Sequence, residues 1–250
     1  MTRWNGDEII NEWLGYPAKC GEFMERKYIV VSPGNKGNGK WLLKTEYFGA
    51  FPETELALLK RGYHVAHIKN KTRWCLDEDT EAQAAFVNFV AEEFGLSTQC
   101  IPVGMSCGGM QAIYLAAKHP EKVSCMYIDA PVVNFLSCPF RFGRETEPAM
   151  PAMAEEFIKA RGIDSVSILS FRAHPLDYLP TLTSHNIPVL LVSGDSDSVV
   201  PFEENGKLLQ DAYTAAGRTI ETHIKPGGDH HPHGLPDCLP IVEFIEKYSA

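Results

Sequence analysis

A serine lies in a sequence context that suits nucleophilic catalysis. Gly104-Met105-Ser106-Cys107-Gly108 has the pattern Gly-x-Ser-x-Gly and stands between a short apolar run, Cys100–Val103, and an alanine-rich segment, Gly108–Ala117. A strand that turns sharply into a helix at such a motif exposes the serine hydroxyl and directs the helix N-terminus toward a developing oxyanion. Only small flanking residues permit that turn. The alternative is an ordinary glycine-rich turn, but the context predicts Ser106 as a nucleophile.

A serine hydroxyl needs a base, and the best candidates are histidines near the C-terminus. His230 is the first histidine after the last predicted strand and follows a Gly-Gly turn, so it can reach over a sheet edge from a loop; His231 and His233 are alternatives. Three clustered histidines also suggest a metal, but His-His-x-His lacks the i, i+4 helical spacing of common zinc sites. We predict His230 as the base, with no metal and no cofactor.

The acid that orients the imidazole has three candidates, all aspartates that follow predicted strands. Asp195 and Asp197 come after the strand Val189–Ser193, and Asp129 follows the preceding strand. We favour Asp197, because it lies beyond the turn, whereas Asp195 is placed to cap that turn through its own backbone. Functional groups gather at the carboxyl ends of parallel strands, so Ser106, Asp197 and His230 are expected at one edge of a sheet.

Short apolar runs alternate with segments of helical periodicity, which predicts an α/β fold with a mostly parallel sheet flanked by helices. The predicted strands are Tyr28–Ser32, Tyr63–Ile68, Cys100–Val103, Val123–Ile128, Pro188–Val192 and Thr219–Ile224. The predicted helices are Pro52–Leu59, Glu78–Phe94, Gly108–Ala117, Glu203–Ala216 and Leu239–Tyr248. No linker or repeat divides the chain, so residues 1–250 are expected to form a single domain.

One long segment interrupts this alternation. Residues 133–185 contain five prolines and no convincing strand, while Pro151–Ala160 and Asp164–Ser170 have the pattern of short helices. A structureless loop of that length is unusual in a compact domain. We therefore predict a helical cap over the sheet, placed where it would govern the choice of substrate.

Composition excludes several classes of function. The 250 residues carry a formal net charge of −9, which offers no basic face to nucleic acid. The first residues lack the cationic start and apolar run of a secretory signal, and no stretch approaches the roughly 20 apolar residues of a membrane span. Seven cysteines, an odd number without paired spacing, argue against a disulfide framework. We expect a cytoplasmic protein that binds neither nucleic acid nor membrane.

From Tyr28 to Tyr248 the sequence resembles the α/β-hydrolase superfamily. The motifs that carry this resemblance lie at 104–108, 194–201 (Gly-Asp-Ser-Asp-Ser-Val-Val-Pro) and 227–230 (Gly-Gly-Asp-His), in the chain order Ser, Asp, His. Segments 41–51, 129–132 and 230–235 look like a subgroup of carbohydrate-active acetylesterases and related hydrolases. The resemblance implies a serine esterase that removes small acyl groups, such as acetyl, from a sugar or similar alcohol through an acyl-enzyme.

The same resemblance implies an oxyanion hole built from two backbone N–H groups. One is the N–H of Cys107, whose contribution is its backbone and not its thiol. The other belongs to the loop after the first strand, where this chain lacks the usual His-Gly pair. Gly34 and Trp41 are the candidates for that second donor.

Aromatic residues could line a substrate site. Trp41 and Trp74 lie in predicted loops after strands, and the polar surroundings of Trp74 favour an exposed role against a sugar ring or an aryl ester. Core packing is favoured for Tyr47 and Phe48, since aromatic residues dominate protein cores. Glu46, in an otherwise apolar run, is either a buried structural acceptor or a substrate contact.

The predicted partner is a small-molecule or oligosaccharide ester. The same three residues could also cleave a thioester, a lactone or a peptide bond, so a thioesterase, a lactonase or a peptidase is the nearest alternative. A protein of another class would use the scaffold only to enclose a ligand, because fold and function separate readily. A base and an acid placed in register with a serine argue against such a binding protein.

Overall fold

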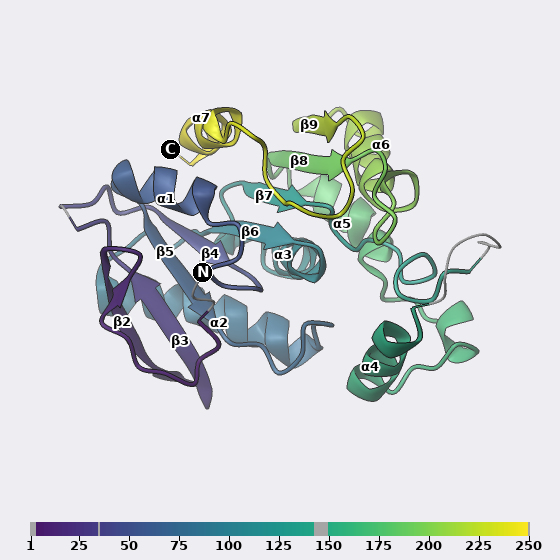
Figure 1. The fold of residues 1–250 in the computed structure, drawn as a ribbon, viewed down its shortest axis with the longest axis horizontal. Coiled ribbons are helices and arrows are strands. Elements are labelled where there is room, and N and C mark those ends of the chain that lie inside the picture. Colours follow the sequence, from purple (N-terminus) through teal and green to yellow (C-terminus); the bar gives the residue numbers. More distant parts are fainter. Residues whose placement is uncertain (1–3, 35, 143–149, 250) are drawn as a thin grey trace.

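The computed structural model describes residues 4–34, 36–142 and 150–249. These residues form a nine-stranded sheet in the order β1-β2-β3-β5-β4-β6-β7-β8-β9 (Figure 1). The first three strands are antiparallel to their neighbours, and the other six are parallel to one another. The bounds are β1 Glu12–Trp13, β2 Tyr16–Phe23, β3 Arg26–Val31, β4 Trp41–Lys44, β5 His64–Ile68, β6 Ile101–Met105, β7 Met126–Asp129, β8 Val189–Gly194 and β9 Ile220–Lys225. The prediction of an α/β fold with a mostly parallel sheet is confirmed.

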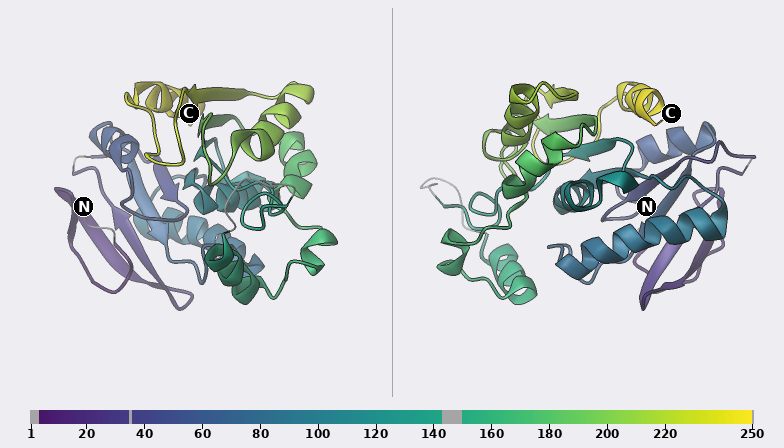
Figure 2. Two further views of the ribbon diagram at one scale, coloured as in Figure 1. Left: turned by 45° about the vertical axis from the view of Figure 1, so that its right-hand side comes forward. Right: turned by 180° about the vertical axis from the view of Figure 1, so that it is seen from behind.

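Helices cover both faces of the sheet, as the turned views in Figure 2 show. Strand β8 illustrates this arrangement: Val189 and Leu191 pack in the core on one face of the sheet, and Leu190 and Val192 pack in the core on the other face. A strand with a helical layer on each side is apolar along its whole length. On the first face lie α2 (Asp77–Phe94), α3 (Cys107–Lys118), α5 (Leu179–Ser184) and α6 (Gly206–Ala215), and on the second α1 (Glu53–Lys60) and α7 (Leu239–Tyr248). Among the helices described, none has the length and apolar character needed to cross a bilayer.

Three of these strands, β1, β2 and β4, are not predicted from the sequence patterns. Strand β2 alternates half-buried with exposed positions at the edge of the sheet, so it carries no apolar run. Strand β4 is four residues long and ends in a lysine. Lys44 is nevertheless buried, because its Nζ donates to Glu55 Oε1 at 2.5 Å and to the Ala50 carbonyl at 3.2 Å. A lysine at position 44 suggests an exposed residue, although its ion pair with Glu55 allows it to lie in the core.

The segment between β7 and β8 contains helices and, in its described part, no strand. The predicted helix Pro151–Ala160 corresponds to α4 (Pro151–Arg161), whereas the predicted helix Asp164–Ser170 contains only a 3-10 turn at Ser167–Leu169. Residues 143–149 of the expected cap lie outside the described residues. Helix α4 lies beyond the carboxyl ends of β6, β7 and β8 (Figure 1), where Phe157 packs in a third apolar cluster.

Candidate active site

Strand β6 turns into helix α3 at Ser106. Ser106 has φ 55° and ψ −118°, a backbone conformation that residues with a Cβ adopt rarely and that is typical of a nucleophile held on a strained turn. The turn leaves no room for side chains beside it. A Cβ on Gly104 would lie 2.3 Å from the Gly108 carbonyl oxygen, and one on Gly109 would lie 2.5 Å from Pro131 Cβ. Glycine at these positions is therefore what allows the chain to close around the serine.

The structure brings the three predicted residues of the triad together. His230 Nε2 lies 3.1 Å from Ser106 Oγ, and His230 Nδ1 lies 2.8 Å from Asp197 Oδ2. The other oxygen of Asp197 accepts the backbone N–H groups of Val199 at 2.8 Å and Val200 at 2.7 Å. Because its carboxylate is buried and both oxygens are engaged, Asp197 holds one orientation toward the imidazole.

The loop that carries His230 is anchored just before the histidine by two aspartates. Asp229 Oδ1 accepts the N–H groups of Ser198 at 3.0 Å and His230 at 2.8 Å, and these two bonds lower the pKa of Asp229 below its usual value. Asp195 Oδ1 accepts the N–H of Gly227 at 2.7 Å. Asp195 therefore holds the loop and does not contact the imidazole, so the structure places Asp197 and not Asp195 beside His230.

Two of the three remaining alternatives for acid and base, Asp129 and His233, are paired with each other. His233 Nδ1 lies 2.8 Å from Asp129 Oδ1, and the N–H of Gly234 donates to Asp129 Oδ2 at 2.6 Å. Burial lowers the pKa of His233 below its ordinary value, although the bond to Asp129 opposes the shift. A second carboxylate–imidazole pair thus stands beside the first, with the two imidazole centroids 4.9 Å apart.

A group of three imidazoles on this loop could hold a metal ion. The ligand atoms of His230, His231 and His233 all lie within 4.8 Å of one another. Zinc binds imidazole nitrogen at about 2.0–2.1 Å, so the rings would have to move closer together to share an ion. An ion bound through His230 Nε2 would occupy the lone pair that faces Ser106.

Ser106 opens into a cavity of about 340 Å³. Its floor is formed by Ser106 and the histidine loop, and its walls come from the loop after β4, from Arg73 and from the segment between β7 and β8. Methionine and cysteine sulfurs contribute much of that wall. Burial raises the pKa of the Cys107 thiol to about 11, which keeps it protonated at neutral pH. The thiol beside the serine is therefore a wall group and a poor nucleophile.

A model of the α/β hydrolase fold family matches residues 64–162. Among solved structures, dipeptidyl peptidase 4 of Porphyromonas gingivalis is 16% identical with a TM-score of 0.68, covering 93% of this chain and 36% of its own. A puromycin hydrolase is 15% identical with a TM-score of 0.69, and the match covers 94% of this chain and 40% of the hydrolase. An acylaminoacyl peptidase of Pyrococcus horikoshii is 14% identical with a TM-score of 0.66, and the match covers 93% of this chain and 42% of the peptidase. This chain has the α/β-hydrolase fold. It spans about two-fifths of the length of these structures, none of which is named as an acetylesterase.

The α/β-hydrolase fold shows why Gly34 and Trp41 are wrong as oxyanion donors. Trp41 is the first residue of β4, wholly buried, and its Nε1 donates to the Ser97 carbonyl at 2.9 Å. Gly34 follows β3, which is antiparallel to β5. Both residues therefore lie at the amino end of the parallel strands, opposite to Ser106. Because β4 is not predicted, the sequence argument selects the loop after β3 in place of the loop after β4.

The loop after β4, residues 45–52, is the one that borders Ser106. Thr45 Oγ1 donates to the Gly108 carbonyl at 2.8 Å, which ties the loop to the start of α3. Tyr47 and Phe51 from the same loop line the cavity. Phe48 packs in the core as predicted, and Tyr47 is half-buried against the third apolar cluster while it also lines the cavity. A second oxyanion donor from a loop would have to come from this segment.

Trp41 and Trp74 also fail as exposed substrate contacts. Trp74 is wholly buried, with its ring 5.1 Å from that of Phe157 in α4, because the segment between β7 and β8 covers it. Glu46 acts as a structural acceptor: its Oε2 accepts Asn70 Nδ2 and Gln111 Nε2, each at 2.9 Å. Of the two interpretations of Glu46, the structure supports the first.

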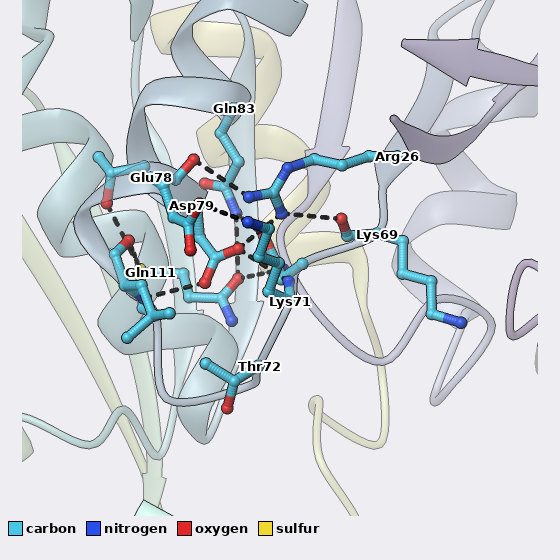
Figure 3. A network of polar contacts seen from close by, with 12 residues as sticks. Arg26, Lys69, Lys71, Thr72, Glu78, Asp79, Gln83 and Gln111 are labelled. Carbon is cyan, nitrogen blue, oxygen red and sulfur yellow. Dashed lines mark hydrogen bonds and ion pairs between the residues drawn. The ribbon is translucent and has the colours of Figure 1, made fainter. Parts of the chain in front are cut away.

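A polar network that the sequence does not reveal holds the loop 69–76 in place (Figure 3). Arg26 of β3 and Asp79 of α2 form a buried ion pair at 2.6 Å. Asp79 also accepts the N–H groups of Lys71 and Leu76, at 2.8 and 2.9 Å. Gln111 of α3 continues the network, since its amide donates to the carbonyl oxygen of Arg73 at 3.1 Å. The network therefore links the helix that begins at the nucleophile to a loop that lines the cavity.

Proposed function

We propose that this protein is a serine hydrolase that cleaves carboxylic esters through an acyl-enzyme. The observation that carries the proposal is the continuous path of hydrogen bonds from Asp197 through His230 to Ser106, with lengths of 2.8 and 3.1 Å. A protein that only encloses a ligand has no use for a base and an acid in register with a serine. The strained backbone at Ser106 supports the same conclusion, because strain of this kind persists where it serves a site.

The geometry dictates the proton transfers. A carboxylate only accepts hydrogen bonds, so the proton of the neutral imidazole stays on Nδ1 facing Asp197, and the Nε2 lone pair faces Ser106. Ser106 Oγ attacks the ester carbonyl carbon while His230 takes its proton. The tetrahedral intermediate then expels the alcohol, whose oxygen receives that proton from the imidazolium. Water attacks the acyl-enzyme by the same route, which releases the acid and restores Ser106.

The cavity favours a short acyl group. At about 340 Å³ it lies near the lower end of the range of small-molecule sites, roughly 300–1,000 Å³. Met105, Met153 and Val199 give it apolar walls, which suit a methyl group better than a charged or hydrated one. We infer that the acyl group is small, such as acetyl, and that it leaves a carbohydrate or similar alcohol.

Peptide hydrolysis is the second candidate, and the structural neighbours favour it. The solved structures with this fold include dipeptidyl peptidase 4 and an acylaminoacyl peptidase. An amide uses the same nucleophile, base and acid as an ester, so the triad alone does not separate the two reactions. Those neighbours are more than twice as long as this chain, so their activity is carried here only as an alternative to be tested.

Three substrates separate these functions. We expect 4-nitrophenyl acetate to be hydrolysed with a burst of nitrophenol, and 4-nitrophenyl octanoate to be hydrolysed more slowly because the cavity is short. A dipeptidyl 4-nitroanilide tests for peptidase activity. Dominant turnover of the anilide would replace the esterase with the peptidase, and loss of all three reactions would contradict both.

The matched control is Ser106→Ala. We expect it to lose at least about 10³-fold in kcat, because the nucleophile is removed while the oxyanion site remains. Its melting temperature should stay close to that of the wild type, since within the described part of the chain Ser106 Oγ makes one polar contact, to His230. A variant that keeps its turnover would refute a serine nucleophile.

A further inference from the structure

The pair formed by Asp129 and His233 has no part in the proton transfers derived for the triad. Asp129 is wholly buried at the end of β7, and its main-chain carbonyl accepts the N–H of Ser106 at 2.9 Å. The backbone of Asp129 is therefore held against the turn at Ser106, while its carboxylate is held by His233 and Gly234. His233 is buried and lines the cavity beside His230; it also borders a neighbouring hollow with Phe51 and His231. Such a well-ordered polar group in a small cavity is placed to contact a substrate.

The contacts of His233 determine which ring nitrogen meets the cavity. Nδ1 faces Asp129 at 2.8 Å, and Asp129 lies behind the cavity wall. The edge of the ring that is left to meet the cavity is the opposite one, which carries Nε2. Among the described residues, Nε2 has no hydrogen-bond partner. The ring is held from the side by Phe51, edge to face, with centroids 5.3 Å apart.

Whether Nε2 donates or accepts a hydrogen bond follows from the partner of Nδ1. A carboxylate only accepts, so Asp129 keeps a proton on Nδ1, and a neutral imidazole then presents a lone pair at Nε2. The group that it recognises must therefore be a donor. An ester carbonyl, an ester oxygen and an acetyl methyl group have no proton to donate, so the donor belongs to the alcohol half of the substrate.

We propose that His233 Nε2 accepts a hydrogen bond from a free hydroxyl group of the alcohol that leaves, and so selects esters of polyhydroxy alcohols. This inference rests on the proposed esterase function. The ring of His233 lies 4.9 Å from that of His230, the residue that hands a proton to the leaving oxygen. A hydroxyl close to the esterified oxygen, as in a diol or a sugar, lies at a comparable distance from it. Asp129 is the positioning residue that fixes the tautomer.

Two esters that differ by one hydroxyl group test the proposal. We expect kcat/KM for 2-hydroxyethyl acetate to exceed that for ethyl acetate, because only the first can donate to Nε2. One neutral hydrogen bond corresponds to about a tenfold preference. Equal rates on the two esters in the wild-type protein would overturn the proposal without any variant. Absence of turnover on both esters and on 4-nitrophenyl acetate would instead refute the esterase function itself.

Two variants then separate selection from positioning. His233→Asn keeps a donor to Asp129 but has no atom at the place of Nε2, so the preference for the hydroxylated ester should fall about tenfold. His233→Gln carries its amide near that place and should restore part of the preference. The control His223→Asn changes a histidine of β9 that pairs with Glu221, and should change neither rate. A parallel loss on both esters would show that His233 only supports the loop, and would refute the proposal.

Discussion

Replacing Asp197 by asparagine tests how the triad works, because the substitution changes one atom and leaves the shape of the side chain intact. The Oδ1 of Asp197 accepts two backbone N–H groups, from Val199 at 2.8 Å and Val200 at 2.7 Å. An asparagine at this position must offer its oxygen to those two donors. Its NH₂ group then faces His230 Nδ1, which has to accept. The proton of the imidazole moves to Nε2, and Nε2 can no longer take the proton of Ser106.

The size of the effect can be worked out from these contacts. To restore the active tautomer, the asparagine would have to turn its oxygen to His230 and leave two buried N–H groups without an acceptor. Each such group costs about 1–3 kcal/mol, so the active arrangement lies about 2–6 kcal/mol above the inactive one. At 1.36 kcal/mol for each factor of ten, that corresponds to a loss of roughly 30-fold to 2 × 10⁴-fold in kcat. The upper part of this range agrees with the loss of about 10⁴ known for the same change in another serine triad.

The assay is steady-state hydrolysis of 4-nitrophenyl acetate, with thermal melting to show that the variant folds. Asp195→Asn is the matched control, two residues away in the same turn. Its oxygen can still accept the N–H of Gly227, so kcat should change by no more than about threefold. Equal losses in the two variants, or a kcat for Asp197→Asn within tenfold of the wild type, would refute the role of Asp197 as the orienting acid.

Three further outcomes follow from the site and its supports. Cys107→Ala should keep most activity, because the predicted contribution of Cys107 is its backbone N–H. With a pKa of about 11, about one-thousandth of the thiol is ionised at pH 8. Alkylation of this thiol, followed by mass spectrometry, should therefore be slow and should accelerate as the pH rises toward that pKa. Arg26→Met leaves the buried carboxylate of Asp79 without its counter-ion and should lower the free energy of unfolding by about 3–5 kcal/mol in urea titrations; Asp79→Asn in the same chain should recover part of the loss, because it removes the charge and keeps one oxygen to accept a loop N–H. Zn²⁺ should inhibit esterase activity reversibly by taking the His230 lone pair, and His231→Ala should weaken that inhibition; insensitivity of the wild type would show that the imidazoles do not share an ion.

The constellation of Ser106, Asp197 and His230 is accessible to sequence reasoning for a physical reason. Each residue follows an apolar strand, and parallel strands deliver their carboxyl ends to one edge. Local patterns that identify the strands therefore also place the side chains that follow them. The choice between Asp195 and Asp197 was open to the same reasoning, because a turn residue that bonds to nearby backbone is not available to an imidazole.

The errors lie where tertiary contacts override local composition. Lys44 makes β4 look like a loop, although Glu55 neutralises it inside the core. Trp74 follows polar residues and looks exposed, but Phe157 covers it from a segment more than 80 positions away. No local signal distinguishes a buried charge from a solvated one. The missed strand then shifts the expected oxyanion loop to the wrong end of the sheet, so that a single local error propagates to Gly34 and Trp41.

The contacts of loop 69–76 with α4 and with the core connect the shape of the cavity to the stability of the fold. Helix α4 is tied to the loop 69–76 at two points: Arg73 forms an ion pair with Glu156, and Arg161 Nε donates to the Trp74 carbonyl at 2.9 Å. That loop is in turn held to the core of the domain by the buried pair of Arg26 with Asp79. Met153 of α4 forms part of the cavity wall, so its distance from Ser106 depends on the loop and on the ion pair beneath it. A change that loosens the loop should therefore alter the shape of the cavity before it unfolds the sheet, because Met153 is held through α4 and this loop, whereas Ser106, Asp197 and His230 follow β6, β8 and β9.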